Sequence, residues 1–218
     1  MDVFFFEAFE EEQEALKRYL PDGVMAGFTP QTIQETGMTT PPARMVSLRT
    51  QSLIPVSWAS NMEALLTRST GYDHLRRYTE QTSVPIPCGY LPLYCARAVA
   101  EQAMLLWMAL YRKWPQQIRQ FGAFHRDGIT GKETEGKRLA VFGVGHIGSE
   151  VAKIGQGLGM EVRGVDIVHR YAHIEYVERD VALAQADIVV CSMNLTKSNA
   201  HYFSLEVLRK CQPGALFI

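Results

Sequence analysis

The amino-acid sequence predicts an α/β fold in which parallel strands alternate with helices, and three observations support this prediction. Short apolar runs alternate with amphipathic stretches over residues 1–94. A glycine-rich turn at residues 143–148 joins an apolar run to a stretch with helical spacing. A further apolar run then ends on Asp166. Alternation of this kind produces parallel sheets that are covered by helices on both faces.

The first part of the chain supplies the elements of one such sheet. Residues 3–6 have the length and composition of a buried strand. Residues 10–20 have an amphipathic helical pattern, which Pro21 and Gly23 end because neither residue favours a continuing helix. Further strands are predicted at residues 24–28, 45–48, 62–66 and 84–87. We therefore expect a first α/β layer that extends to about Tyr94.

A markedly apolar helix is predicted next, at residues 98–111. Glu101 and Gln102 are its only polar residues, and a helix that is apolar on every face must be covered on every face. One interpretation is a core helix of a single domain. The other is a helix that lies between two domains and also against a second subunit, and this interpretation predicts a homodimer. A polar segment, residues 117–137, follows.

The glycine turn lies at the centre of a strand–turn–helix–strand pattern. Residues 139–142 form the first predicted strand and residues 161–165 the second. Gly143 permits the tight turn, Gly145 lets the backbone approach a pyrophosphate, and Gly148 lets the helix pack closely on the strand. The pyrophosphate would lie on the free N–H groups of the helix N-terminus, where the helix dipole favours negative charge. The pattern is typical of dinucleotide-binding domains.

Asp166 indicates which dinucleotide is bound. It lies 21 residues after Gly145, where a carboxylate can accept hydrogen bonds from both hydroxyls of an adenosine ribose. The same carboxylate repels a 2′-phosphate, so the sequence favours NAD over NADP. His169 and Arg170 follow closely and could offset a phosphate charge, but NAD remains the prediction. The alternative is a glycine turn of the same fold that binds nothing.

The last part of the chain continues the second sheet. A third strand is predicted at residues 187–191, and its carboxyl end, residues 192–199, should lie above the sheet where cofactors bind. A helix at residues 203–211 and a strand at residues 215–218 follow. The sequence stops inside this apolar strand, so we expect a fragment of a longer chain.

The composition argues against several classes of protein. A formal net charge of −1 gives no electrostatic reason to bind nucleic acid or an anionic membrane. The histidines do not fall in a metal-ligand spacing, and the four cysteines form no CxxC pair. The acidic N-terminus does not resemble a signal peptide, and the longest apolar helical segment, residues 103–111, is much shorter than the ~20 residues that span a bilayer. We expect a cytoplasmic protein with reduced thiols.

Several motifs together resemble the D-isomer-specific 2-hydroxyacid dehydrogenases, and the D-lactate dehydrogenase branch in particular. The similarity lies in STGYD at residues 69–73, YCARAVAE at 94–101, GKE at 131–133 and GKRLAVFGVGHIG at 136–148, and it is weak over residues 1–40. The resemblance implies a flavodoxin-like substrate domain, residues 1–96, followed by a Rossmann NAD-binding domain, residues 97–218. The second domain would begin with the interdomain helix and be incomplete at its C-terminal end.

The resemblance also implies an activity and the residues that serve it. The activity is the NAD-dependent interconversion of a small 2-keto acid and a D-2-hydroxy acid. The implied substrate-binding residues are Arg49, Thr50, Gly71 and Tyr94, the first three in loops that offer backbone N–H groups to a carboxylate. The implied cofactor-binding residues are Gly143, Gly145, His146, Ile147, Gly148, Asp166, Met193, Asn194 and Asn199.

The sequence also departs from the family pattern. Asn194 stands where the family often has proline, and Arg97 replaces a small polar residue at the start of the long helix. The arginine, glutamate and histidine of the family's hydride chemistry are expected beyond Ile218, so we assign no catalytic residue within 1–218. The alternative function is a non-catalytic NAD-sensing or interaction protein of the same fold.

Overall fold

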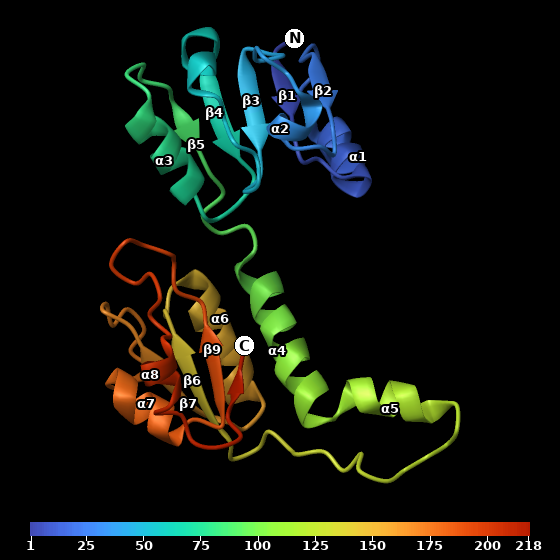
Figure 1. The fold of residues 1–218 in the computed structure, drawn as a ribbon, viewed down its shortest axis with the longest axis vertical. Coiled ribbons are helices and arrows are strands. Elements are labelled where there is room, and N and C mark those ends of the chain that lie inside the picture. Colours follow the sequence, from blue (N-terminus) through green and yellow to red (C-terminus); the bar gives the residue numbers. More distant parts are fainter. The chain divides into compact units, whose positions relative to one another are not determined.

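A computed structural model describes residues 1–218, which form two compact units, Met1–Tyr94 and Cys95–Ile218. Each unit contains one five-stranded sheet with helices packed on it (Figure 1). Every strand pair in both sheets is parallel, as the alternation of strands and helices predicts. The chain contains no helix with the length and apolar character needed to cross a membrane.

The sheet of the first unit has the strand order β2-β1-β3-β4-β5. This is the flavodoxin-like order, in which the connections change direction between β1 and β3. Its strands are β1 (Val3–Phe5), β2 (Ala26–Phe28), β3 (Met45–Leu48), β4 (Ala64–Thr67) and β5 (Cys88–Gly89). The last strand was predicted at residues 84–87 but begins at Cys88. Pro85 and Pro87 lack the N–H groups that a strand donates to its neighbour, so the ladder starts after them.

Alternate residues of β1 face the two sides of this sheet. Phe4 and Phe6 pack with Trp58 on one side, where η1 and α3 contribute further apolar residues. Val3 and Phe5 pack on the other side against apolar residues of α1. The helices of this unit are α1 (Glu10–Tyr19), α2 (Ile33–Thr36), the 3-10 helix η1 (Val56–Asn61) and α3 (Asp73–Gln81). The apolar run at the start of the chain is therefore buried on both faces.

The second unit has the strand order β10-β9-β6-β7-β8, a Rossmann-type parallel sheet. Its strands are β6 (Arg138–Phe142), β7 (Glu161–Val165), β8 (Glu175–Tyr176), β9 (Ile188–Cys191) and β10 (Leu216–Phe217). Its helices are α4 (Ala96–Tyr111), α5 (Trp114–Phe121), α6 (His146–Gly157), α7 (Arg179–Gln185) and α8 (Leu205–Leu208). Both predicted strands of the glycine-turn pattern are present and pair directly.

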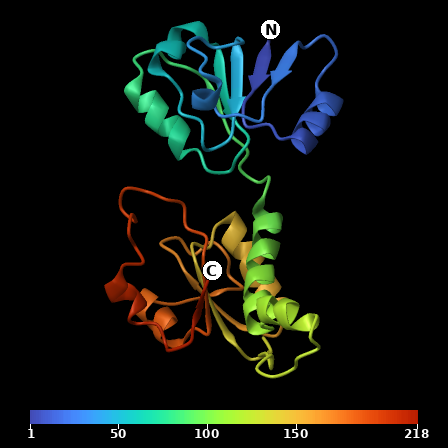
Figure 2. The same ribbon diagram turned by 45° about the vertical axis from the view of Figure 1, so that its right-hand side comes forward.

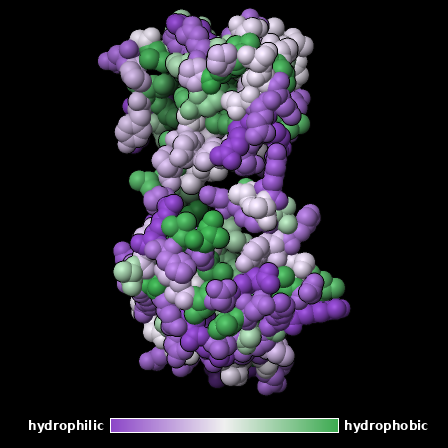
Figure 3. All heavy atoms as spheres, turned by 90° about the vertical axis from the view of Figure 1, so that its left-hand side faces the viewer, coloured by the Kyte–Doolittle hydropathy of each residue, from purple (hydrophilic) through white to green (hydrophobic).

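Strand β6 separates two apolar cores in this unit. Leu139 and Val141 pack with residues of α4 and α6 on one face. Ala140 and Phe142 pack with residues of α7 and α8 on the other, and both views of the ribbon show these helix pairs on opposite sides of the sheet (Figure 1, Figure 2). On the surface seen in Figure 3, hydrophilic and hydrophobic residues are interspersed.

Helix α4 buries one of its faces within the second unit. Ala100, Ala103, Trp107 and Tyr111 are buried, and the core that contains them also contains residues of α6. Leu105, Leu106 and Leu110 are 44–56% exposed, so the helix is covered on one face only.

Several short elements were not predicted correctly. Helix α5 and strand β8 were not predicted, and α8 is shorter than the predicted helix at residues 203–211. Helix α5 has no buried residue, and β8 contributes only two residues to the sheet. Strand β8 is too short to produce a hydrophobic period. Trp114, Ile118 and Phe121 of α5 do have helical spacing, although no helix was predicted there.

Candidate functional site

The first part of the candidate site is the turn between β6 and α6. Gly143 has φ +83°, and a Cβ atom built on it would lie 2.6 Å from the backbone nitrogen of Met193. A larger residue is excluded both by this backbone conformation and by the close approach of the segment after β9. The structure therefore brings together Gly143 and Met193, two residues that the sequence assigned to one site.

The other two glycines of the turn have different surroundings. A Cβ atom on Gly148 would lie 2.1 Å from the carbonyl oxygen of Gly143, so this glycine is needed for the helix to pack against the turn. A Cβ atom on Gly145 would meet nothing within 4 Å, so the turn is open to a ligand on that side. Gly145 is also the N-cap of α6 and provides no side chain to cap the helix. The N–H groups of the first turn remain available to an anion.

His146 and Ile147 occupy the first turn of this helix. His146 is exposed and Ile147 is half-buried. The only side-chain hydrogen bond within this turn runs from Ser149 Oγ to the carbonyl oxygen of His146 at 3.0 Å, which leaves the N–H groups unaffected. The geometry therefore fits the diphosphate of a dinucleotide at the N-terminus of α6.

Asp166 follows β7 and reaches back to the glycine turn. Its Oδ2 accepts the N–H of Val144 at 2.6 Å, and its Oδ1 accepts the N–H of Val168 at 3.0 Å. A carboxylate has about four acceptor positions, so two such bonds orient the group and leave lone pairs for ribose hydroxyls. The carboxylate thus also holds the glycine turn, a role that the sequence pattern did not reveal.

Residues 192–199, which follow β9, contact the glycine turn. Ser192, which the sequence did not single out, donates from Oγ to the carbonyl oxygen of Gly143 at 2.7 Å. Asn199 donates from Nδ2 to the carbonyl oxygen of Asn194 at 2.7 Å and accepts the N–H of Thr196 at 2.7 Å. The side chain of Asn199 therefore fixes this loop through its own backbone.

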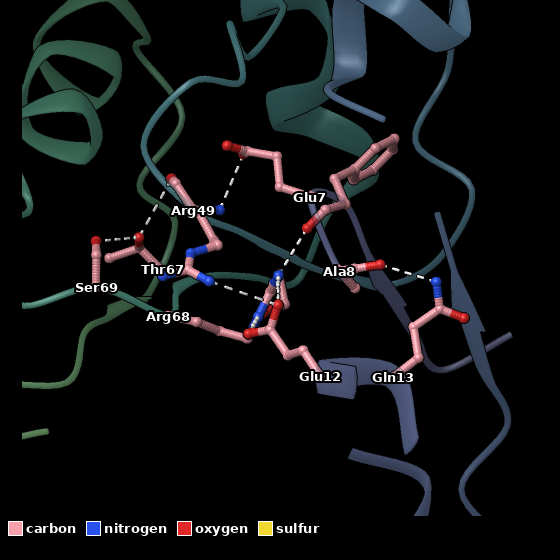
Figure 4. A network of polar contacts seen from close by, with 10 residues as sticks. Glu7, Ala8, Glu12, Gln13, Arg49, Thr67, Arg68 and Ser69 are labelled. Carbon is pink, nitrogen blue, oxygen red and sulfur yellow. Dashed lines mark hydrogen bonds and ion pairs between the residues drawn. The ribbon is translucent and has the colours of Figure 1, made fainter. Parts of the chain in front are cut away.

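The predicted substrate loops follow β3 and β4 in the first unit (Figure 4). The N–H of Arg49 donates to Glu7 Oε2 at 2.9 Å, so that group is engaged within the protein. The N–H groups of Thr50 and Gly71 have no protein acceptor. Tyr94 is 57% exposed and is the last residue of the first unit. Thr50 and Gly71 are thus the better placed of the predicted carboxylate-binding groups.

Buried polar residues lie directly behind these loops, and the sequence did not single them out. Arg68 donates from Nε to Glu12 Oε1 at 2.8 Å and from Nη2 to the carbonyl oxygen of Phe6 at 2.8 Å (Figure 4). Glu7 is 4% exposed. Arg68 directly follows β4, and Glu7 lies two residues after the end of β1, so a charged residue at a strand end is a signal the sequence did contain.

None of the histidines is assigned as the acid or base of a reaction, and three of them have the following surroundings. His74 is half-buried, its Nε2 lies 3.1 Å from Thr67 Oγ1, and burial lowers its pKa. His125 pairs with Asp127 at 3.1 Å, and His201 is exposed. No group of three or more His, Cys, Asp or Glu residues could hold a metal ion.

Comparison with known proteins agrees with this geometry. A family model described as "D-isomer specific 2-hydroxyacid dehydrogenase, NAD binding domain" matches residues 103–218. The D-lactate dehydrogenase kk1H of Curvularia clavata is 30% identical over 168 residues, which cover 74% of this chain and 47% of that protein. The 2-hydroxyacid dehydrogenase A of Aspergillus oryzae is 30% identical over 168 residues, covering 74% and 48%. The chain thus spans about half the length of the curated relatives it matches.

Solved structures of low sequence identity share the fold. The D-lactate dehydrogenase of Escherichia coli has a TM-score of 0.83 at 20% identity, and the match covers 100% of this chain and 72% of that one. The pyruvate reductase of Chlamydomonas reinhardtii has a TM-score of 0.82 at 22% identity, covering 100% and 68%. The family model covers just over half of the chain, and its matched domain binds NAD. The chain belongs to the D-isomer-specific 2-hydroxyacid dehydrogenase family.

Proposed function

We propose that this protein is an NAD-dependent oxidoreductase that interconverts a small 2-keto acid and the corresponding D-2-hydroxy acid, with a D-lactate-like substrate. The main support for the proposal is the open glycine turn, in which the N–H of Val144 donates a hydrogen bond to Asp166. The family to which the chain belongs supplies the chemistry class. Several of its relatives are named as D-lactate dehydrogenases.

The residues of this chain would bind and orient the two reactants. The diphosphate would lie on the N–H groups at His146 and Ile147, and Asp166 would accept the ribose hydroxyls. Bound NAD supplies or accepts the hydride. A substrate carboxylate would be held by the N–H groups of Thr50 and Gly71, which have no protein acceptor.

The domain roles follow from this division. We propose residues 1–96 as the substrate domain and residues 97–218 as the NAD-binding domain, with the long helix α4 at the start of the latter. We also propose a cytoplasmic location. The exposed leucines of α4 support a homodimer in which a second copy covers that face.

The experiment is a turnover assay on the purified full-length gene product. NADH absorbance is followed while pyruvate, 2-ketobutyrate, glyoxylate, hydroxypyruvate and phenylpyruvate are supplied in turn. We expect NADH to be oxidised with at least one of these acids, and a small side chain should be preferred. Tight NADH binding without turnover on any acid would instead support the sensing or interaction function.

A further inference from the structure

A buried carboxylate lies directly behind one of the two proposed substrate loops. Glu7 follows β1, is 4% exposed, and has φ +54°. A buried acid is unusual, and a positive φ is uncommon for a residue that carries a Cβ. Both features persist only where the surrounding structure fixes them. The backbone N–H of Glu7 donates to the carbonyl oxygen of Gln31 at 3.0 Å, which helps to hold this conformation.

The carboxylate of Glu7 is surrounded by backbone N–H groups. Its oxygens accept the N–H of Arg49 at 2.9 Å, of Gln51 at 2.9 Å and of Ser52 at 3.2 Å. Glu7 forms no ion pair, because the nearby Arg68 is engaged by Glu12 instead. The negative charge of Glu7 is therefore balanced by peptide dipoles, the arrangement that proteins use to bind anions.

This arrangement determines which N–H group the loop leaves available. Of the four consecutive N–H groups at residues 49–52, three donate to Glu7 and that of Thr50 donates to no protein acceptor. Two further contacts fix the loop. Thr67 Oγ1 lies 3.4 Å from the carbonyl oxygen of Arg49 (Figure 4). Ser52 Oγ accepts the N–H of Ile33 at 3.2 Å.

We propose that Glu7 is a positioning residue for the substrate carboxylate, acting through the loop at residues 49–52. The buried charge draws three N–H groups inward, so that the Thr50 N–H is presented to the ligand. The inference rests on the proposed function, because it assumes that a 2-keto acid binds at this loop. Glu7 itself touches no reactant and moves no proton.

A carboxylate is required for this role, and an amide of the same shape would not fill it. Glutamine has one acceptor oxygen, and its NH2 group would face N–H donors where Glu7 has its second oxygen. Glu7→Gln therefore loses at least one of the three bonds and releases part of the loop. Glu7→Asp keeps the charge on a shorter side chain and should have an intermediate effect.

The first test is kinetic and uses the full-length gene product with NADH and its best 2-keto acid. Glu7→Gln should raise the KM for the keto acid roughly tenfold and change kcat less. A roughly tenfold loss of affinity is expected when the substrate carboxylate loses its hydrogen bond to the Thr50 N–H. The Kd for NADH should stay unchanged. The matched control is Glu11→Gln, an exposed acid of α1 that makes the same change of charge and should leave the KM unaltered. A Glu7→Gln enzyme with a KM within about twofold of the wild type would overturn the proposal.

A second measurement needs no variant and no turnover. Amide hydrogen exchange by NMR reports each N–H group of the loop separately. Without ligand, we expect slow exchange of the N–H groups of Arg49, Gln51 and Ser52 and fast exchange of the Thr50 N–H. Oxamate is an unreactive analogue of a 2-keto acid, and in the presence of NADH it should slow the exchange at Thr50. Exchange at Thr50 as slow as at its neighbours without ligand, or unaffected by oxamate, would overturn the proposal. If the wild-type protein oxidises no NADH, this result counts against the proposed function. The hydrogen-exchange rates of residues 49–52 then still test the role of Glu7.

Discussion

Asp166 has two roles in this account of the site, and replacing it by alanine removes both. The carboxylate holds the N–H of Val144 and is proposed to hold the adenosine ribose. Asp166→Ala should weaken NADH binding roughly tenfold or more, because a charge-assisted hydrogen bond is lost, and should narrow the preference over NADPH. Fluorescence titration with each nucleotide measures both effects. Equal affinity of the wild type for NADH and NADPH would refute this role of Asp166.

The lowered pKa of His74 leads us to expect that the free energy of unfolding depends on pH. Burial lowers its pKa in the folded protein, the charges of Asp73 and Glu7 raise it less, and Arg77 lowers it further. The unfolded chain, with an ordinary histidine pKa of about 6.5, therefore binds a proton at a higher pH than the folded protein does. The contribution of His74 is fully present above that pH and is lost as the pH falls through the lower, folded pKa.

Urea unfolding at a series of pH values measures this contribution. His74→Gln should flatten the decline in the free energy of unfolding on the acidic side. The exposed His173→Gln is the control and should leave the decline in place. An identical slope for His74→Gln and the wild type would contradict the assignment.

Single residues were predictable where their partners are close in sequence. The three glycines and Asp166 belong to a pattern of fixed spacing, so their positions could be read directly. Glu7 could not be assigned, because its three N–H partners lie 42 to 45 residues away. Ser192 was missed for the same reason, since it bonds to Gly143 across the sheet. Only the place of Glu7 close to the end of a buried strand hinted at its role.

At the scale of the element, helix α6 provides a matched pair of glycines. A Cβ on Gly148 would lie 2.1 Å from a backbone oxygen, whereas one on Gly157 would meet nothing within 4 Å. Gly148→Ala should therefore destabilise the fold by about 1–3 kcal/mol, as overpacking does. Gly157→Ala should stabilise it by up to about 1 kcal/mol through helix propensity. Chemical denaturation of both variants measures the difference, and equal effects would contradict the packing described for the turn.

The exposed leucines of helix α4 lead us to expect a dimer. Leu106 lies on its exposed face, so Leu106→Glu should dissociate the proposed dimer by placing a charge in an apolar interface. The neighbouring Trp107 is 0% exposed within the unit, so its replacement would damage the core instead. Sedimentation of the full-length gene product shows the oligomer directly, with the exposed Tyr19→Glu as control. A monomeric wild type would contradict the dimer.

Elements were predictable where the sequence shows an apolar pattern that was recognised. Strands β1, β3, β6, β7 and β9 and helices α1, α4 and α6 gave such patterns. The two-residue strand β8 is too short for a period, and the helical spacing of Trp114, Ile118 and Phe121 in α5 was not recognised. Strand β5 was displaced because its prolines were read as part of the strand.

At the scale of the whole molecule, the alternation of strands and helices predicted two parallel sheets, and the structure confirms them. The order of strands within each sheet was not readable from local pattern, because it depends on which strands pair across long connections. That order places Glu7 and the two substrate loops at one edge of the first sheet, and the glycine turn beside Ser192 in the second. Each proposed site thus arises from strand ends that are distant in the sequence.

The proposed oxidation of D-2-hydroxy acids with NAD can be measured directly as the formation of NADH. The purified full-length gene product is incubated with NAD and either D-lactate or L-lactate, then with the enantiomers of longer 2-hydroxy acids, while NADH formation is recorded. We expect NADH formation from at least one D-enantiomer and none from its L-counterpart. Oxidation of the L-enantiomers, or no NADH from any acid while NAD is bound, would contradict it.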